Sequence, residues 1–312
     1  MIGYLLDWLR RRDPVDRVFL SMGAGIESRR RNLARYWRPH FAESRRVEAE
    51  WIASLAAGGS LIVAGAGRLN DLDEAAARRF ERIHLLDADA RNCPAWKRFR
   101  RRMGPGTEVD WTIADVAGCI HAWVRSLDLG TWDSALGSIR RAAAIPADPP
   151  RIHADAVLSL SLLSQIPIVW QDAVEARLRR RFGSRMVDSR EREWLDSVAI
   201  GARLLVERHL EWVRRTARQA LLIADIEYAY YEGATPFSRY RYRPPPVGWS
   251  AEEGWSCPDA SKVAVEPALY GVDLGEPAAT WLWHIRPLGL ESLTEGTVHR
   301  VGAFRFGGGP AL

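Results

Sequence analysis

Residues 59–89 read GSLIVAGAGRLNDLDEAAARRFERIHLLDAD, and this stretch decides the fold. It contains SLIVA (60–64), a continuous apolar run whose length and composition suit a strand buried on both faces. The segment DLDEAAARRFE (71–81) opens with acidic residues, which favour a helix N-terminus. RIHLLD (82–87) is a second apolar run of strand length. The order predicts two parallel strands joined by a glycine turn and a helix.

Outside this stretch the chain keeps alternating between strand-like and helix-like segments. Five further segments are predicted strands: EVDWTIAD (108–115), DAVLSLSLL (155–163), ALLIADIEY (220–228), TWLWHIRP (280–287) and VHRVGAFRF (298–306). A helical stretch over 120–127 follows the third strand, and an amphipathic helix over 193–217 precedes the fifth. The last two strands alternate as a closing hairpin does. We therefore predict an α/β fold: a doubly wound, mostly parallel seven-stranded sheet with helices on both faces and an antiparallel edge strand.

Two segments do not follow this alternation of strands and helices. Residues 27–56 are predicted to be helical, with Pro39 kinking or dividing the segment. We expect an N-terminal helical region over 1–57 and an α/β domain over 58–312. Residues 228–262 are rich in Tyr, Arg, Pro and Gly and are predicted to be irregular. This segment is either a lid over a ligand or a proline-stiffened surface loop.

The composition is that of an ordinary soluble protein, with 47% hydrophobic residues, 27% charged residues and a net charge of +5. No apolar run approaches the ~18 residues that a membrane span requires. In MIGYLLDWLRRR (1–12) the arginines follow the apolar part, which is the reverse of a secretory signal. Cys93, Cys119 and Cys257 are spaced too widely for a disulfide framework or a metal site. We expect a cytoplasmic protein without a membrane span or a metal.

The glycine turn GAG (65–67) and Asp87 together predict a nucleotide site. In an open parallel sheet, ligands bind beyond the carboxyl ends of the strands. Glycine accepts unusual dihedral angles and lets a ligand approach the backbone. Asp87 ends the second strand 87 − 65 = 22 residues after Gly65, close to the ~20 typical of a carboxylate that binds a ribose diol. Asn70 stands at the third glycine position of a dinucleotide fingerprint, which disfavours NAD and FAD.

Four places give the chain a resemblance to the class I S-adenosylmethionine-dependent methyltransferases. VAGAG (63–67) resembles the family's glycine loop against the methionine part of the cofactor, and Asp87 matches its ribose-binding acid. IADV (113–116) is similar to the loop beside the adenine. DAVLSLSLLSQIP (155–167) resembles the fourth strand and the turn where the methyl acceptor lies. The resemblance extends over residues 59–115, 155–167 and 220–228.

The resemblance implies S-adenosylmethionine as the cofactor and a small molecule as the best-fitting acceptor. It assigns the cofactor to Gly65, Ala66, Gly67, Asp87, Ala88, Asp115 and Val116. The acceptor is expected near Ser159, Ser161, Gln165 and Tyr228. None of these is a convincing base, but methyl transfer to a good nucleophile needs only alignment and desolvation. No residue is therefore assigned as catalytic.

One position departs from the family pattern. The family commonly has an acidic residue two positions before its first loop glycine, and this chain has Val63 there. Asp71 or Asp73 would then serve the cofactor's ammonium group, or both are ordinary helix N-terminal residues. Asp89 is expected to cap the turn that follows it.

Two other functions stay open on the sequence. A binding or scaffold protein that keeps the fold without catalysis is favoured by Val63 and by the lack of a recognisable acceptor motif, because a fold does not guarantee a function. An RNA-directed methyltransferase is suggested by clusters of basic residues, almost all arginine, at residues 10–12, 29–31, 97–102 and 179–181. Such clusters are also common on solvated surfaces. The oligomeric state is left open.

Overall fold

The computed structural model describes residues 13–142, 144–233, 261–287, 290–292 and 294–307. Its helices are α2 (Pro14–Asn32), α3 (Ala34–Ser54), α4 (Glu74–Ala77), α5 (Cys93–Met103), α6 (Ile120–Arg125), α7 (Trp132–Ala142), α8 (Leu162–Phe182), α9 (Ser184–Ser189) and α10 (Glu191–Thr216), with a 3₁₀ turn at Ala90–Asn92. Its strands are β1 (Ser60–Ala64), β2 (Arg82–Asp87), β3 (Glu108–Ile113), β4 (Ala154–Leu160), β5 (Ala217–Glu232), β6 (Ser261–Pro267), β7 (Ala279–Arg286) and β8 (Glu295–Phe306).

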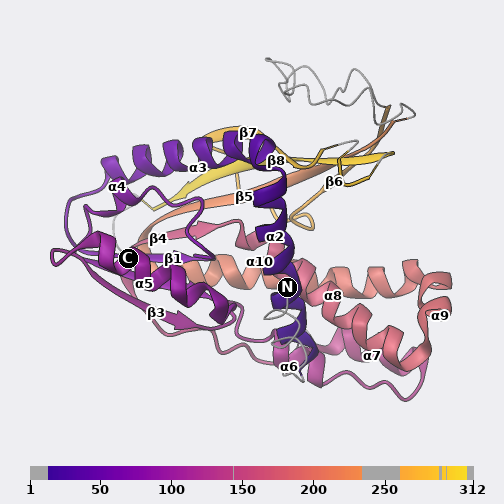
Figure 1. The fold of residues 1–312 in the computed structure, drawn as a ribbon. Coiled ribbons are helices and arrows are strands. Elements are labelled where there is room, and N and C mark those ends of the chain that lie inside the picture. The colour runs from indigo at the N-terminus through magenta and orange to yellow at the C-terminus, as the bar shows by residue number, and fades with distance from the viewer. Residues whose placement is uncertain (1–12, 143, 234–260, 288–289, 293, 308–312) are drawn as a thin grey trace.

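The strands form one mixed sheet in the order β3-β2-β1-β4-β5-β8-β7, and β6 pairs with β5 as an eighth strand (Figure 1). The neighbours from β3 to β5 are all parallel. Antiparallel pairing is confined to the β5 end of the sheet, where β8 lies between β5 and β7. The predicted doubly wound, mostly parallel sheet is confirmed. The strand order reverses between β1 and β4, and a ligand crevice is expected at their carboxyl ends.

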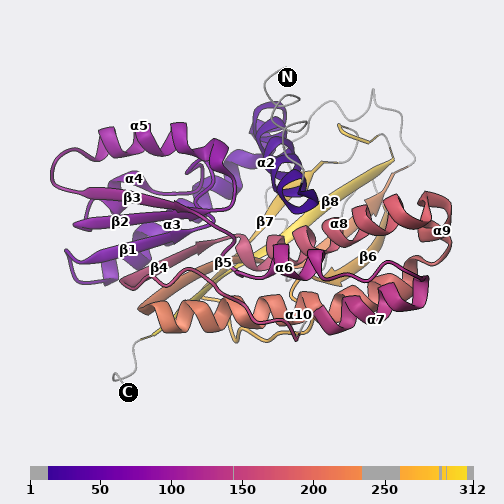
Figure 2. The same ribbon diagram turned by 90° about the horizontal axis from the view of Figure 1, so that it is seen from below.

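Helices cover both faces of the parallel strands (Figure 2). Leu61 and Val63 of β1 belong to the core shared with α3, α4 and α5. Ile62 and Ala64 belong to a second core on the other face, shared with α10. This division follows from the strand itself, because successive side chains point to opposite faces. A third core joins α6, α7, α8 and α10 beside the sheet.

The N-terminal helices divide at Leu33, and Pro39, which was predicted to kink or divide the segment, does not divide it. Leu33 has φ −111° and ψ 22°, which interrupts the helix between α2 and α3. Pro39 lies in the second turn of α3, close enough to the helix start that few backbone bonds are affected. In the described residues, α3 packs on β7 and α2 packs on α8. The division into regions 1–57 and 58–312 stays a prediction.

Most predicted elements differ from the observed ones by a few residues at their ends, and two of these differences affect the site. The helix expected over 71–81 is the four-residue α4. It starts late because the Asp73 side chain caps it by accepting from the Ala76 N–H at 2.8 Å. The strand expected over 155–163 ends at Leu160, and α8 begins two residues later. Both changes leave loops at the carboxyl ends of β1 and β4.

The segment 228–262 was predicted to be irregular, and its two described ends are strands instead. β5 continues to Glu232, and β6 begins at Ser261 and pairs with it antiparallel. Residues 234–260, which contain most of the expected lid, lie outside the described residues.

Candidate active site

The glycine turn after β1 is held by contacts that leave no room for a side chain at Gly65. Gly65 and Gly67 have φ of +71° and +46°, in the left-handed region that favours glycine. The N–H groups of Gly65 and Ala66 both donate to the Leu86 carbonyl, at 2.9 and 3.1 Å. A Cβ on Gly65 would lie 2.6 Å from the Leu160 carbonyl oxygen. The turn therefore places bare backbone between the ends of β2 and β4.

Asp87, the last residue of β2, ties this turn to the neighbouring strand. Its Oδ2 accepts from the Gly67 N–H at 2.9 Å. Its Oδ1 accepts from the Asp89 N–H at 2.8 Å and from the Asn92 amide at 3.2 Å. Burial raises the pKa of Asp87 to about 6, and the Asp89 carboxylate adds to the shift. Because Oδ2 accepts a single bond from the described residues, it keeps a lone pair for a ligand hydroxyl.

The two other acids near these strand ends, Asp115 after β3 and Asp89 after β2, already have hydrogen-bond partners. Asp115 follows β3 and accepts from the N–H groups of Ala117 at 2.9 Å and Ile120 at 3.0 Å, which caps the turn into α6. Burial raises its pKa. Asp89 accepts from the Arg91 N–H at 3.0 Å and pairs with the Arg91 guanidinium at 2.6 Å. Asp89 thus caps the following turn, as expected.

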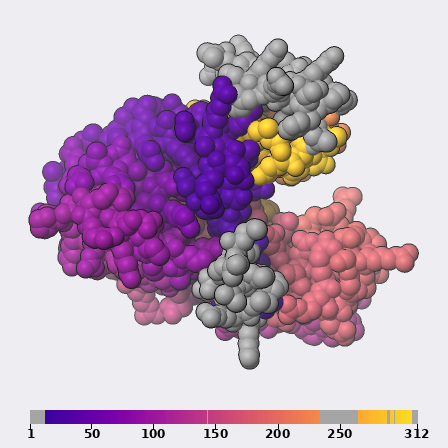
Figure 3. Space-filling model, in the orientation of Figure 1, coloured from indigo at the N-terminus to yellow at the C-terminus, as the bar shows by residue number. Residues whose placement is uncertain are grey.

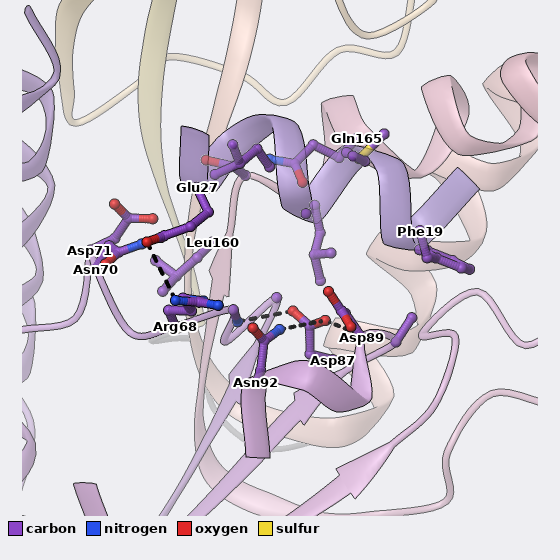
Figure 4. Close-up of a pocket in the computed structure, with 18 of the residues that line it drawn as sticks. Phe19, Glu27, Arg68, Asn70, Asp71, Asp87, Asp89, Asn92, Leu160 and Gln165 are labelled. Atoms are coloured by element: carbon purple, nitrogen blue, oxygen red, sulfur yellow. Dashed lines mark hydrogen bonds and ion pairs between the residues drawn. The ribbon is translucent and has the colours of Figure 1, made fainter. Parts of the chain in front are cut away.

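These strand ends line a cavity of about 530 Å³ at the point where the strand order reverses (Figure 4). The residues predicted to bind the cofactor that line it are Gly65, Gly67, Asp87, Ala88, Asp115 and Val116. Of the predicted acceptor residues, Ser161 and Gln165 line it. Ser161 has φ +53°, and its N–H donates to the Ile223 carbonyl at 2.7 Å. This sharp turn directs the chain from β4 into α8 along the cavity wall.

Three predicted site residues are not brought to the cavity. Ala66 is 2% exposed and belongs to the core beneath the turn. The Ser159 hydroxyl instead lies 2.8 Å from His209 Nε2, in the core between β4 and α10. Tyr228 lies within the extension of β5, where its ring is 4.4 Å from that of His299. All three are held by packing within the sheet and its helices.

Helix α2 covers the open side of the cavity, a position that no local pattern in its sequence predicts. The residues of α2 that line the cavity are Phe19, Met22, Gly23, Ala24, Ile26, Glu27, Ser28 and Arg31. Gly23 packs so closely on the β2 turn that a Cβ there would lie 2.7 Å from Asp89 Oδ2. Arg91 donates to the Leu20 carbonyl at 2.7 Å and fixes the helix in place. Figure 3 shows α2 crossing this face between the purple and salmon parts of the molecule.

The cavity offers apolar walls and hydrogen-bonding groups. Its aromatic lining consists of Phe19, Trp37, Phe41 and Trp283. Behind this wall, His40 is neutral because burial lowers its pKa to about 3, and burial does the same to His209 beside β4. Neither imidazole lines the cavity. A site of this kind can align a nucleophile and remove water from it.

Within the described ranges, every helix is too short or too polar to cross a bilayer. In that same part of the chain, His, Cys, Asp and Glu side chains form no group of three or more able to hold a metal ion. Cys93 and Cys119 are free thiols, and Cys257 lies outside the described residues.

Asp87 is expected to favour the folded state in mild acid. Its pKa of about 6 lies above the ordinary 3.8, so between these pH values the folded state holds a proton that the unfolded state has released. The free energy of unfolding that this group contributes therefore falls as the pH rises through that window, by about 1–3 kcal/mol. Urea unfolding of the wild type and Asp87→Asn checks this. The advantage of the wild type should be larger in mild acid than above neutrality, and an equal difference would contradict it.

Comparison with known proteins finds distant structural likenesses. An N-methyltransferase from Bradyrhizobium japonicum, solved with S-adenosylhomocysteine, aligns over 90% of this chain and 98% of its own, with 12% identity and a TM-score of 0.35. Magnesium protoporphyrin IX methyltransferase from Synechocystis, with the same ligand bound, aligns over 84% and 83%, with 11% identity and a TM-score of 0.35. Precorrin 8W decarboxylase from Methanobacterium thermoautotrophicum aligns over 85% and 90%, with 11% identity and a TM-score of 0.34.

No protein-family model and no curated protein matches the sequence. The functional assignment therefore rests on the geometry of the cavity itself.

Proposed function

We propose that this protein is an S-adenosylmethionine-dependent methyltransferase that acts on a small molecule. The proposal is carried by one observation: the glycine turn, Asp87 and Asp115 line the same cavity, at the reversal of strand order in a doubly wound sheet. Ligands of such sheets bind at this place. An adenosine needs a close backbone approach and a carboxylate for its ribose diol, and this cavity offers both.

The residues present fit the adenosyl part of the cofactor. The Gly65 turn presents backbone without side chains, and Asp87 Oδ2 has a lone pair for a ribose hydroxyl. Ala88 and Val116 give the adenine an apolar surface. The Asp115 carboxylate accepts backbone bonds from Ala117, Cys119 and Ile120, and of its four lone-pair positions one is left for an exocyclic amino group.

The chemistry that the cofactor supplies when bound is an electrophilic sulfonium methyl group. The protein's own part is to bind and orient. Ser161 and Gln165 provide polar atoms at the β4 end of the cavity, where they can hold an acceptor. Helix α2 and the aromatic wall exclude water from the same space. Alignment and desolvation are then the contributions expected of these residues.

Two observations favour this function over its alternatives. The cavity is about 530 Å³ and is not filled by side chains, which favours ligand binding over a scaffold role. The described basic clusters are dispersed, with 97–102 on α5 and 179–181 on α8 at opposite ends of the molecule (Figure 2). Several of their arginines pair internally: Arg29 with Glu291, Arg102 with Glu74, and Arg179 with Glu175 and Asp188. A single nucleic-acid footprint would instead gather unpaired cations on one face.

Calorimetric titration with S-adenosylmethionine and S-adenosylhomocysteine tests the proposal. We expect both to bind one site per chain, with a dissociation constant well below ~1 mM. NAD serves as the control and is expected not to bind, since Asn70 replaces the third glycine of the dinucleotide fingerprint. Absence of binding by both adenosyl ligands at near-millimolar concentration would defeat the proposal.

A further inference from the structure

One end of the cavity is a corner of charged and amide side chains, separate from the strand ends that hold Asp87. Its residues are Glu27 and Arg31 of α2 and Arg68, Asn70 and Asp71 of the loop after the glycine turn. Figure 4 shows Glu27, Arg68, Asn70 and Asp71 gathered at this end. Their charges divide into a positive side and a negative side, and this division is what a zwitterion requires.

The positive side is built around Glu27. The Glu27 carboxylate lies 2.9 Å from Arg30, 3.3 Å from Arg31 and 3.3 Å from Arg68. Hydrogen bonding to Arg30 holds the pKa of Glu27 below its ordinary value, with Arg68 and the other arginines adding to the effect. Three guanidinium groups around one carboxylate leave an excess of positive charge. Arg68 uses one nitrogen in this pair, so it has further N–H donors for an anionic group.

The negative side is Asp71, which has a free carboxylate oxygen although the Arg45 charge lies near enough to lower its pKa. Asp71 Oδ1 is buried and has no hydrogen-bond partner among the described residues. His40 Nε2 lies 4.0 Å away, beyond hydrogen-bond range. Trp281 donates to His40 Nδ1 at 3.0 Å, so the proton of the neutral ring is on Nε2. Burial raises the pKa of Asp71 to about 6, which still leaves it ionised above neutral pH.

Helix α3 places further polar atoms without partners behind Asp71. Glu48 is fully buried, and its Oε2 accepts from the Asp73 N–H at 3.0 Å. Its Oε1 and the Ser44 hydroxyl have no partner in the described structure. His40, Ser44 and Glu48 are spaced four residues apart and therefore share one face of α3. Glu48 and Asp71 thus each have a carboxyl oxygen without a partner, and Asp71 is the one of the two that lines the cavity. A donor at Asp71 would have to come from the cavity.

Asp73, the other candidate acid in the sequence, already has a hydrogen-bond partner in the protein. Its carboxylate caps α4 at Ala76, and Asp73 does not line the cavity. Val63, the position that is commonly acidic in the family it resembles, is fully buried in the core. Neither residue can meet a ligand in the cavity. Asp71 is therefore the acid that remains.

We infer that this corner binds an α-amino acid head group, with Asp71 accepting from its ammonium and Arg68 donating to its carboxylate. The inference rests on the proposed function, in which the head group is that of the cofactor's methionine part. It places recognition of the head group on the α4 loop and the N-terminal helices, with no contribution from the end of β1. Helix α2 contributes Glu27, which orients Arg68, and α3 supplies the polar backing of Asp71.

Calorimetry on Asp71→Asn with two ligands tests the inference. S-adenosylhomocysteine carries the amino acid head, and methylthioadenosine lacks it but keeps the adenosine and the sulfur. At about pH 8 we expect Asp71→Asn to weaken S-adenosylhomocysteine binding roughly ten- to a hundredfold, because a bond to a charged group is lost. Methylthioadenosine should bind both proteins within about twofold.

The matched control is Asp73→Asn, because asparagine caps a helix about as well as aspartate. It should bind both ligands as the wild type does, and circular dichroism should show both variants folded. Unchanged S-adenosylhomocysteine binding in Asp71→Asn, or equal weakening of both ligands, would overturn the inference and leave the proposed function standing. Failure of the wild type to bind either ligand would defeat the proposed function and the inference with it.

Discussion

Replacing Gly65 with alanine is expected to destabilise the fold by about 2–5 kcal/mol, or to prevent folding, because strain and steric overlap add at one position. The left-handed φ of +71° disfavours any side chain there. The new Cβ would lie 2.6 Å from the Leu160 carbonyl oxygen and 2.7 Å from Leu162 Cγ. Backbone cannot retreat from this overlap without breaking the pairing of β1 with β4. Urea unfolding followed by tryptophan fluorescence measures the loss.

Gly67→Ala is the matched control two residues along the same turn. It also has a positive φ, but a Cβ there would meet nothing closer than the Gly65 carbonyl oxygen at 3.8 Å. Only the backbone strain remains, so the expected cost is about 1–2 kcal/mol. Equal destabilisation by the two substitutions would show that steric closure of the turn against β4 is not what fixes its geometry.

Strand positions in the parallel part of the sheet could be predicted well from the sequence. The predicted strands 60–64 and 82–87 coincide with β1 and β2, because each is an apolar run that must be buried on both faces. The long helix predicted over 193–217 is α10, Glu191–Thr216. Its apolar stripe is a local signal, so it does not depend on knowing the partner. The position of Asp87 at a strand end could be predicted for the same reason, since the apolar run that it ends defines the strand.

The rest of the site depends on contacts between segments far apart in the chain. Arg91 bonds to Leu20, 71 residues earlier, and nothing local in α2 shows that it will cover the cavity. Ser159 and Ser161 are two residues apart, so in a continuous strand both side chains would point to the same face of the sheet. Only the end of β4 at Leu160 and the positive φ of Ser161 separate them, so that one reaches the cavity and the other meets His209.

The loop 68–73 shows a further limit of local pattern. Acidic residues at Asp71 and Asp73 have the same preference for a helix start. In the structure Asp73 takes the cap and Asp71 faces the cavity. The choice is made by α3, where Glu48 accepts from the Asp73 N–H at 3.0 Å. Such a choice follows from packing and has no counterpart in the sequence of the loop.

Asp87→Asn is expected to weaken S-adenosylhomocysteine binding about a hundredfold, or about 3 kcal/mol. The substitution removes the charge that a ribose diol would donate to. It also turns an amide N–H₂ toward one of the backbone N–H groups that donate to Asp87, that of Gly67 or that of Asp89. Asp89→Asn is the control, because Asp89 also lines the cavity but is committed to Arg91. It should change the affinity less than about threefold.

A ligand that lacks the ribose hydroxyls separates a direct contact from a structural effect of Asp87. If Asp87 accepts from the diol, the 2′,3′-dideoxy analogue of S-adenosylhomocysteine should bind the wild type about as weakly as S-adenosylhomocysteine binds Asp87→Asn. Binding of the dideoxy analogue to Asp87→Asn should then lose little more binding free energy than either change alone, since both changes remove the same hydrogen bonds. Fully additive losses would mean that Asp87 acts only by holding the Gly67 turn at 2.9 Å. In that case the carboxylate shapes the cavity, and the ribose is bound by other groups.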